Sequence, residues 1–586
     1  MLRPRFGPVL AVLSAVASAV LFAQAPPKRP LTEPDLNTIA QLLMLEDTRT
    51  FDQDVLGPAL KSPHPEVRLR AAIAIARIVK PEGRALLEAA GQAARGDCPA
   101  CAPEFAATIV FAMGQQKNPE TVAWLSERLL SPASPAAVAR EAATALGKVR
   151  TPEARAALVK FLTTAPKTAV NGTIAGEAML SLGRFPYGDD AEVMIRWADS
   201  PDVTVRWKAA WGLFRPRDPK AIPTLLKLAD DPSPDVRMWA VRGLGAAPVP
   251  QPGRAGAPPP PPVPIDPPGL DRAKLAAVLR AKTKDPDRRV RTEAFRTLAS
   301  YVDDESFAIV LAGLQSTDTW ISVMAAESFG PSQANRYRPR SAELVPKLVA
   351  AAAAGKPLAL RISAVAALAA YAPEAAIEPA AQLAQETTSV DARNAGRGGL
   401  RGLGPAGQAR LAELPAPPAA APQPAAPPPA RTLADYRRIV DKYVLPDYKG
   451  APKPRAVWTT PRGTIEIELY AGDAPIGTDY FVHLVESGDL VGTEVGRNAP
   501  GFVVQFAATK NTIRQRDEVN QRGLTRGNLA WASAGLDTGR PGYTLGNQAQ
   551  PHNEGDFTSL GRVIRGMDVV DRLERTDRIT AARMVK

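Results

Sequence analysis

The chain has 586 residues, of which 72 are basic and 60 acidic, giving a formal net charge of +12. This length is too great for one hydrophobic core, so about two to four domains are expected. The positive charge is spread over many arginines, and no block of basic residues interleaved with aromatic residues occurs, so we expect no nucleic-acid partner.

Residues 1–25 have the pattern of a secretory signal peptide. Arg3 and Arg5 give a positive start, residues 9–23 form an apolar run, and Ala23-Gln24-Ala25 is a small-residue cleavage site. The run is too short for a comfortable transmembrane helix. Enrichment in alanine, proline and arginine is typical of a GC-rich bacterial genome. The sequence therefore predicts an exported bacterial protein, periplasmic or secreted, with no stable membrane span after cleavage; the alternative is an uncleaved anchor.

The only two cysteines form the motif Cys98-Pro-Ala-Cys101, in a loop between helical patterns. Between a strand and a helix of a cytosolic protein, this spacing would indicate a thioredoxin-like site. A zinc site lacks further ligands, because the chain has only three histidines. In an oxidising compartment we therefore expect a local disulfide, with redox catalysis as the alternative. No metal site is expected.

Residues 32–411 repeat one pattern ten times: an apolar residue, a mostly small residue four positions later, and an apolar residue eight positions later. This spacing gives each helix one apolar stripe, with a small residue where a neighbouring helix crosses closely. A Pro-rich insertion at 247–268 interrupts the period and is expected to bulge as a loop. The copies begin at Val67, Phe105, Val138, Ile174, Val205, Val236, Val290, Ile321, Leu360 and Ala392.

Six copies carry an arginine directly after the first position, often with Asp or Glu just upstream: Arg68, Arg206, Arg237, Arg291, Arg361 and Arg393. This pattern resembles the HEAT-like repeat, a pair of antiparallel helices. The resemblance implies an all-α superhelical solenoid that offers a surface to a protein partner, which the sequence does not identify. We expect the arginines to pair with acids of the same or the next repeat, the alternative being a ladder for a ligand.

Several tryptophans recur at helical spacing within these repeats. We expect them to lie in the core or to line the groove, the alternative being a concave aromatic patch for a partner. They are Trp207, Trp211, Trp239 and Trp320.

A Pro/Ala-rich linker at 412–432 separates the solenoid from a second domain at 446–586, which a lead-in helix at 431–444 precedes. Polyproline-type segments act as semi-rigid spacers. Because this tether carries little apolar surface, we expect the solenoid to fold independently of the second domain.

The second domain opens with a predicted strand at 464–470, a helix at 479–487 capped by Thr478, and a second strand through Val491 and Val495. A series of spaced residues follows the same register: Tyr480-Phe481, Leu484, Gly488, Leu490, Gly492-Thr493, Val495-Gly496-Arg497, Pro500-Gly501-Phe502 and Gln505. At these residues the chain resembles a cyclophilin, the peptidyl-prolyl cis–trans isomerase family. The resemblance implies a mainly-β closed barrel with flanking helices. The expected fold class is thus multidomain, an all-α HEAT-like solenoid followed by this barrel.

The resemblance also implies an activity on proline-containing polypeptides that needs no cofactor. Isomerisation is slow because amide resonance sets a barrier of about 20 kcal/mol. Arg497 is implied to donate to the prolyl nitrogen of the twisted amide, Phe502 to form the floor under the proline ring, and Gln505 to bond the substrate backbone. The other implied substrate-binding positions are Val503, Ala532, Ser533, Thr544, His552 and Phe557.

Several of these positions depart from the family pattern. Ser533 stands where the family has Asn, Gly542 where it has Gln, Thr544 where it has Phe, His552 where it has Trp, and Phe557 where it has His. Each lost aromatic is expected to weaken proline binding by about 1–3 kcal/mol.

We therefore expect a slow peptidyl-prolyl isomerase that acts on exported proteins, with the solenoid as scaffold. One alternative is a non-catalytic scaffold or prolyl-peptide-binding protein with a degenerate barrel. Another is a solenoid that is itself the functional part and binds a polymer or an assembly.

Overall fold

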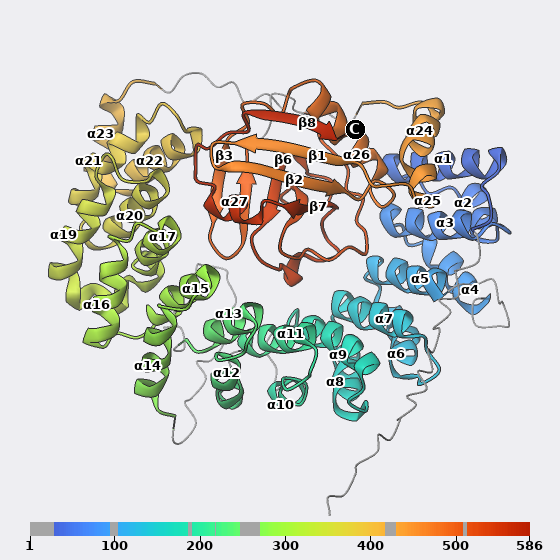
Figure 1. Ribbon diagram of the computed structural model, residues 1–586, viewed down its shortest axis with the longest axis horizontal. Helices are drawn as coiled ribbons and strands as arrows, with labels where there is room; N and C mark the ends of the chain where they lie inside the picture. Colours follow the sequence, from blue (N-terminus) through green and yellow to red (C-terminus); the bar gives the residue numbers. More distant parts are fainter. Residues whose placement is uncertain are drawn as a thin grey trace, which may run out of the picture.

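A computed structural model describes residues 28–93, 103–185, 190–216, 218–245, 270–416, 429–507 and 513–585. Paired helices form an arc, and a β-barrel sits inside the arc (Figure 1). The predicted signal peptide, both cysteines, the Pro-rich insertion and most of the linker lie outside the described residues. None of the helices in the described ranges is both long and apolar enough to cross a membrane.

Ten of the described helices carry the predicted repeat and line the inner side of the arc (Figure 1). They are α3 (Pro65–Ile78), α5 (Pro103–Gln115), α7 (Ala136–Val149), α9 (Ala169–Leu182), α11 (Val203–Phe214), α13 (Pro234–Gly243), α15 (Arg288–Leu298), α17 (Thr319–Ser328), α20 (Leu358–Tyr371) and α22 (Val390–Gly402).

The remaining solenoid helices pack on these ten. They are α1 (Glu33–Thr48), α2 (Gln53–Leu60), α4 (Gly83–Ala93), α6 (Val122–Leu130), α8 (Pro152–Thr164), α10 (Ala191–Ile195), α12 (Ile222–Leu228), α14 (Arg272–Lys282), α16 (Asp304–Gly313), α18 (Ala334–Tyr337), α19 (Ser341–Ala352), α21 (Pro373–Ala384) and α23 (Gly404–Glu413). Short 3₁₀ turns occur at η1 (Pro119–Thr121), η2 (Pro219–Ala221), η3 (Pro331–Gln333) and η4 (Arg338–Arg340).

The predicted stripe explains why these helices stack. In all ten copies the first and third positions are buried, so each inner helix turns its apolar stripe into the core between neighbouring repeats. The arginine that follows the first position pairs with an acid of the next repeat, Arg206 with Asp231 at 2.7 Å and Arg237 with Asp285 at 2.9 Å. For these copies the ion-pair interpretation is confirmed.

The C-terminal strands form one antiparallel sheet in the order β3-β4-β6-β5-β7-β2-β1-β8. An antiparallel bridge connects Glu494, just before the edge strand β3, with Arg578, three residues before the other edge strand β8. The strands are β1 (Arg455–Thr460), β2 (Gly463–Leu469), β3 (Val495–Ala499), β4 (Val503–Phe506), β5 (Asn528–Ala532), β6 (Arg540–Gly546), β7 (Ser559–Arg565) and β8 (Ala581–Val585).

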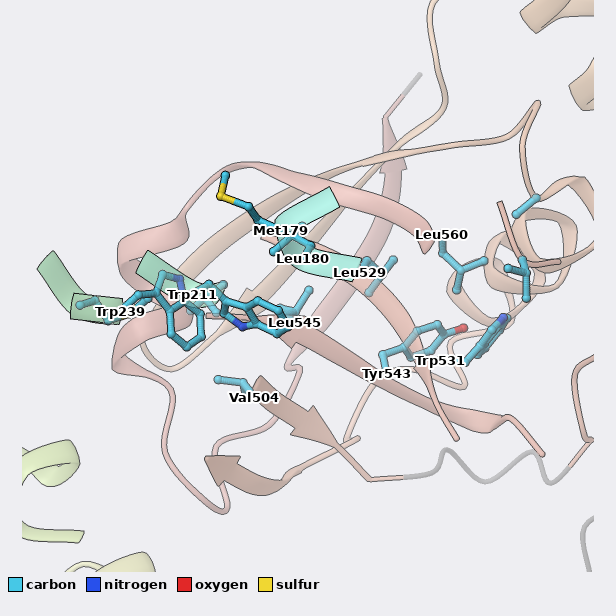
Figure 2. Close-up of a cluster of buried hydrophobic side chains, with 14 of the residues drawn as sticks. Met179, Leu180, Trp211, Trp239, Val504, Leu529, Trp531, Tyr543, Leu545 and Leu560 are labelled. Atoms are coloured by element: carbon cyan, nitrogen blue, oxygen red, sulfur yellow. The ribbon is translucent and has the colours of Figure 1, made fainter. Parts of the chain in front are cut away.

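Aromatic residues fill the interior of this barrel. Trp458 is fully buried, and its ring centroid lies 5.3 Å from that of Phe506 and 6.0 Å from that of Phe481. Trp531 and Tyr543 lie next to each other in Figure 2, with ring centroids 4.9 Å apart. Such pairs contribute to stability beyond the area that they bury. They therefore help to fix the positions of the strands that carry the site.

Two helices flank the barrel, α26 (Pro475–Glu486) and α27 (Met567–Arg572). The predicted cap at Thr478 is wrong, because α26 begins at Pro475 and Thr478 is buried inside it. The carboxylate of Glu518, distant in the sequence, instead accepts two backbone N–H groups of the first turn, at 3.1 and 2.6 Å. Burial raises the pKa of Glu518 to about 7, against the opposing effect of Arg77 and of these N–H groups.

The lead-in helix packs against the first helix of the solenoid. It consists of α24 (Leu433–Ile439), a π-helical turn η5 (Val440–Val444) and α25 (Leu445–Tyr448). Asp47 of α1 lies 2.7 Å from the guanidinium of Arg431 and accepts a hydrogen bond of 2.7 Å from the hydroxyl of Tyr436. After the linker the chain thus returns to the opposite end of the arc, where α24 lies beside α1 (Figure 1).

The barrel is docked in the concave face of the solenoid, which differs from the expectation of two parts joined only by a tether. Arg49 forms an ion pair with Asp537 at 2.5 Å. Further contacts extend along the arc, and most are donated by solenoid side chains to backbone carbonyls of the barrel. They are Arg70 to Gly472, Arg77 to Asp473 and Val519, Gln115 to Gly555, Arg184 to Pro551 and Glu554, Arg288 to Asp571, and Arg296 to Pro500.

Candidate functional site

Strands β3, β4, β6 and β5 bring part of the predicted site into one row. Arg497 is the register partner of Gln505, Gln505 that of Thr544, and Thr544 that of Ala530. Directly paired residues of antiparallel strands project to the same face of a sheet. Arg497 is exposed, whereas Gln505 and Thr544 are half-buried. The row therefore offers a guanidinium, an amide and a hydroxyl to one ligand.

Phe502 lies beside this row in the turn between β3 and β4. Its backbone N–H donates to the carbonyl of Ala499 at 3.0 Å, and Gly501 before it has a φ of 72° that favours glycine. The guanidinium carbon of Arg497 lies 5.7 Å from the centroid of the Phe502 ring, and the ring of His552 stacks on Phe502 at 5.7 Å. The half-buried phenyl ring thus lies near both a cation and an imidazole.

His552 occupies the short 3₁₀ turn η6 (Pro551–Asn553). His552 is exposed to solvent on one side, but the protein around its imidazole desolvates it and lowers its pKa to about 4; the nearby guanidinium groups of Arg215, Arg242 and Arg184 act in the same direction. The imidazole is therefore neutral at pH 7. A neutral ring stacked on Phe502 supplies part of the apolar surface for which the family pattern has Trp.

The other predicted positions are spread over the same wall. Val503 is buried within β4, and Ala532 ends β5. Ser533 follows Ala532, and its buried hydroxyl has no hydrogen-bond partner among the described residues. Phe557 is half-buried in the segment before β7. None of these four lines the cavity above Arg497 and Phe502, and neither Gln505 nor Thr544 does. Of the predicted site residues, this cavity brings together Arg497, Phe502 and His552.

This cavity of about 430 Å³ lies between the barrel and the solenoid. Arg497, Phe502 and His552 line it from the barrel side. Its solenoid side includes Trp211, Phe214, Arg215, Trp239, Arg242 and Arg296. As expected for core or groove-lining residues, Trp211 and Trp239 are buried and line this cavity from the adjacent inner helices α11 and α13 (Figure 2). The arginines of this cavity are not predictable from the sequence, because nothing in their spacing separates them from surface residues.

Comparisons with known proteins match both parts of the chain. The family described as "Cyclophilin type peptidyl-prolyl cis-trans isomerase/CLD" matches residues 456–586, and HEAT repeats match residues 98–176 and 191–252. A peptidyl-prolyl cis-trans isomerase of Synechococcus elongatus is 30% identical over 139 residues, which are 22% of this chain and 96% of that protein.

Two further relatives match the same part. An isomerase of Arabidopsis thaliana is 30% identical over 125 residues, covering 20% of this chain and 78% of that protein. A crystal structure of a Cryptosporidium parvum cyclophilin-type isomerase has 18% identity and a TM-score of 0.22, covering 23% of this chain and 98% of that chain.

Proposed function

Because the chain belongs to the cyclophilin-type peptidyl-prolyl cis–trans isomerase family, we propose that it isomerises prolyl bonds of exported proteins, with its HEAT-repeat solenoid as a protein-interaction scaffold. The observation that carries the isomerase site is the row of Arg497, Gln505 and Thr544 beside Phe502. These side chains come from three strands whose register fixes their spacing.

The proposed mechanism uses position and charge rather than bond formation. As the amide twists, the prolyl nitrogen becomes pyramidal and accepts a hydrogen bond, which the guanidinium of Arg497 donates. Gln505 bonds the substrate backbone, so that the bound chain rotates on one side of the prolyl bond only. Phe502 and the neutral ring of His552 contact the proline ring through their apolar faces.

The second candidate function is prolyl-peptide binding without catalysis. Gly542 and Thr544 favour it, because they stand where the family pattern has Gln and Phe. A smaller apolar surface binds the proline ring less tightly, so the site stabilises the twisted amide less.

The assay that separates these functions uses the full chain and a tetrapeptide containing Ala-Pro. We expect the protein to accelerate the exchange between cis and trans peptide in proportion to its concentration. NMR exchange spectroscopy measures this rate. The pocket substitutions predict a rate below that of a typical cyclophilin. Peptide binding with no acceleration at saturation would contradict the isomerase function and support the binding function.

The proposal of export rests on residues 1–25. Their positive start, apolar run and small-residue end support secretion and cleavage before Pro26. In the oxidising compartment, Cys98 and Cys101 would then form a local disulfide. N-terminal sequencing of protein recovered outside the cytoplasm is expected to begin near Pro26, and an intact Met1 there would contradict the prediction.

A further inference from the structure

The solenoid contributes an aromatic wall to the cavity above Arg497 and Phe502. Phe214 and Trp239 stack with ring centroids 5.3 Å apart and planes 8° from parallel, and Trp211 meets Phe214 edge-on at 6.1 Å. Trp211 and Trp239 are buried, whereas Phe214 is half-buried at the cavity. A ligand on Phe502 therefore has a second apolar surface within reach, on a separate domain.

The side chains that line this cavity carry a net positive charge. Its lining includes five arginines but one acid, Glu327: Arg215, Arg242, Arg296, Arg497 and Arg575. Two acids outside the lining partly neutralise this charge: Glu293 lies 2.5 Å from Arg296 and 3.8 Å from Arg242, and Asp391 lies 3.8 Å from Arg575. Within the described part of the chain, neither Arg215 nor Arg497 forms an ion pair with a carboxylate. A bound anion would supply a counter-charge for these two guanidinium groups.

Unused hydrogen-bond acceptors distinguish this cavity from a site for a simple anion. Gln548 lines it with a side chain that is 2% exposed, and its amide oxygen has no partner among the described residues. The amide oxygen of Asn498, also in the lining, is buried and equally without a partner there. Buried acceptors without donors are costly, and a peptide backbone supplies N–H donors to satisfy them.

We propose that the solenoid forms half of the substrate site, and that the cavity selects proline-containing peptides with a carboxylate side chain close to the proline. This inference rests on the proposed isomerase function, because Arg497 and Phe502 hold the prolyl bond. Arg215 and Arg242 attract the carboxylate, Phe214 covers apolar parts of the peptide, and Gln548 accepts a backbone N–H group.

The test compares peptides that differ by one charge. In each pair, Glu or the isosteric Gln stands one or two residues before or after the proline, and the full chain is assayed for cis–trans exchange. At one or more of these positions we expect kcat/KM for the Glu peptide to exceed that for the Gln peptide about five- to tenfold. The ratio should fall as salt is added. Equal values in every pair would overturn the inference while leaving the isomerase function intact.

The same peptides also separate the two proposals if no catalysis occurs. Dissociation constants from tryptophan fluorescence would then show whether Glu peptides bind more tightly than Gln peptides. Tighter binding without catalysis contradicts the isomerase function but supports the acidic selectivity. An acidic peptide with Ala in place of Pro must compete poorly; equal competition would make the cavity a general anion site and overturn the inference.

Variants locate the selectivity on the solenoid. Arg215→Gln, at an exposed position, is expected to lower the Glu-to-Gln ratio about threefold, and Arg215→Gln with Arg242→Gln to abolish it. Arg410→Gln is the matched control, because this solenoid arginine lies on α23 and pairs with Glu378, away from the cavity. If the folded double variant keeps the ratio of the parent chain, the carboxylate binds elsewhere and the inference is wrong.

Discussion

Replacing Arg77 with alanine is expected to lower the free energy of unfolding by about 3–5 kcal/mol. The guanidinium lies 2.6 Å from the carboxylate of Glu46 and 3.9 Å from that of Glu518, and the side chain is 2% exposed. It also donates to the barrel carbonyls of Asp473 and Val519 at 2.5 and 3.1 Å. Truncation leaves two buried carboxylates without their cation and two carbonyls without their donor, which is why one residue has so large an effect.

The loss of unfolding free energy in Arg77→Ala should depend on pH. Burial raises the pKa of Glu518 to about 7, and Arg77 opposes this rise, so the variant raises this pKa further. Above pH 7 the Glu518 carboxylate of the parent chain is charged and lies beside Arg77. In the variant the same carboxylate is either charged and buried without a cation, or it binds a proton at a cost in free energy. Near pH 5 the carboxyl is protonated in both chains, so the penalty from Glu518 disappears. Urea unfolding at pH 5 and pH 8 measures the difference.

Arg410→Ala provides the control for this experiment, because that ion pair with Glu378 is at the solenoid surface and contributes at most about 1 kcal/mol. A loss below 1 kcal/mol for Arg77→Ala at both pH values would mean that this cluster does not hold the barrel to the solenoid. Adding Glu46→Gln to Arg77→Ala should recover part of the loss, since it removes one of the two stranded charges.

The parts of the fold that the sequence predicts are those set by local spacing. The apolar stripe recurs within each helix, so Val67 and Leu368 are assigned to the core from neighbours a few residues away. Arg497 and Gln505 are register partners because the turn that contains Phe502 joins β3 directly to β4. Their pairing follows from one continuous stretch of chain.

The docking of the barrel could not be predicted in this way. Arg77 and Arg296 are single arginines on helices, and their partners include the backbone carbonyls of Asp473 and Pro500. Every residue has such a carbonyl, so the partner leaves no trace in the sequence. The helix cap supplied by Glu518 from a distant segment is hidden for the same reason, since only the fold brings it to α26.

The docking of the barrel on the solenoid also changes which residues surround the candidate site. The cavity joins Phe502 of the barrel to Phe214 of the solenoid, so in the proposed site the solenoid adds aromatic surface to that of the barrel. The barrel sequence alone departs from the family pattern at several pocket positions, whereas in the assembled chain solenoid residues lie across the cavity from Phe502. In the proposed site the solenoid thus contributes residues directly, in addition to any outer surface that it offers to a partner.

Replacing Arg497 with alanine is expected to lower kcat/KM for a prolyl peptide by a factor of about 10² to 10³. In the proposed mechanism this guanidinium alone donates to the prolyl nitrogen, and that bond forms only in the twisted state. Its loss should therefore reduce kcat more than it raises KM. Phe502→Ala should have the opposite balance and mainly raise KM, because the ring contacts the proline in both the planar and the twisted state.

The stability of the chain should hardly change in Arg497→Ala, which makes the result a test of function. Arg497 is exposed, and its guanidinium carbon lies 5.7 Å from the centroid of the Phe502 ring. Arg565→Ala is the matched control, since this β7 arginine has a side chain that is 81% exposed and forms a loose ion pair with Glu466 at 3.7 Å. Exchange rates that are equal in the parent chain, Arg497→Ala and Arg565→Ala would remove Arg497 from the mechanism. If all three also equal the uncatalysed rate, prolyl-peptide binding is the function that the site supports.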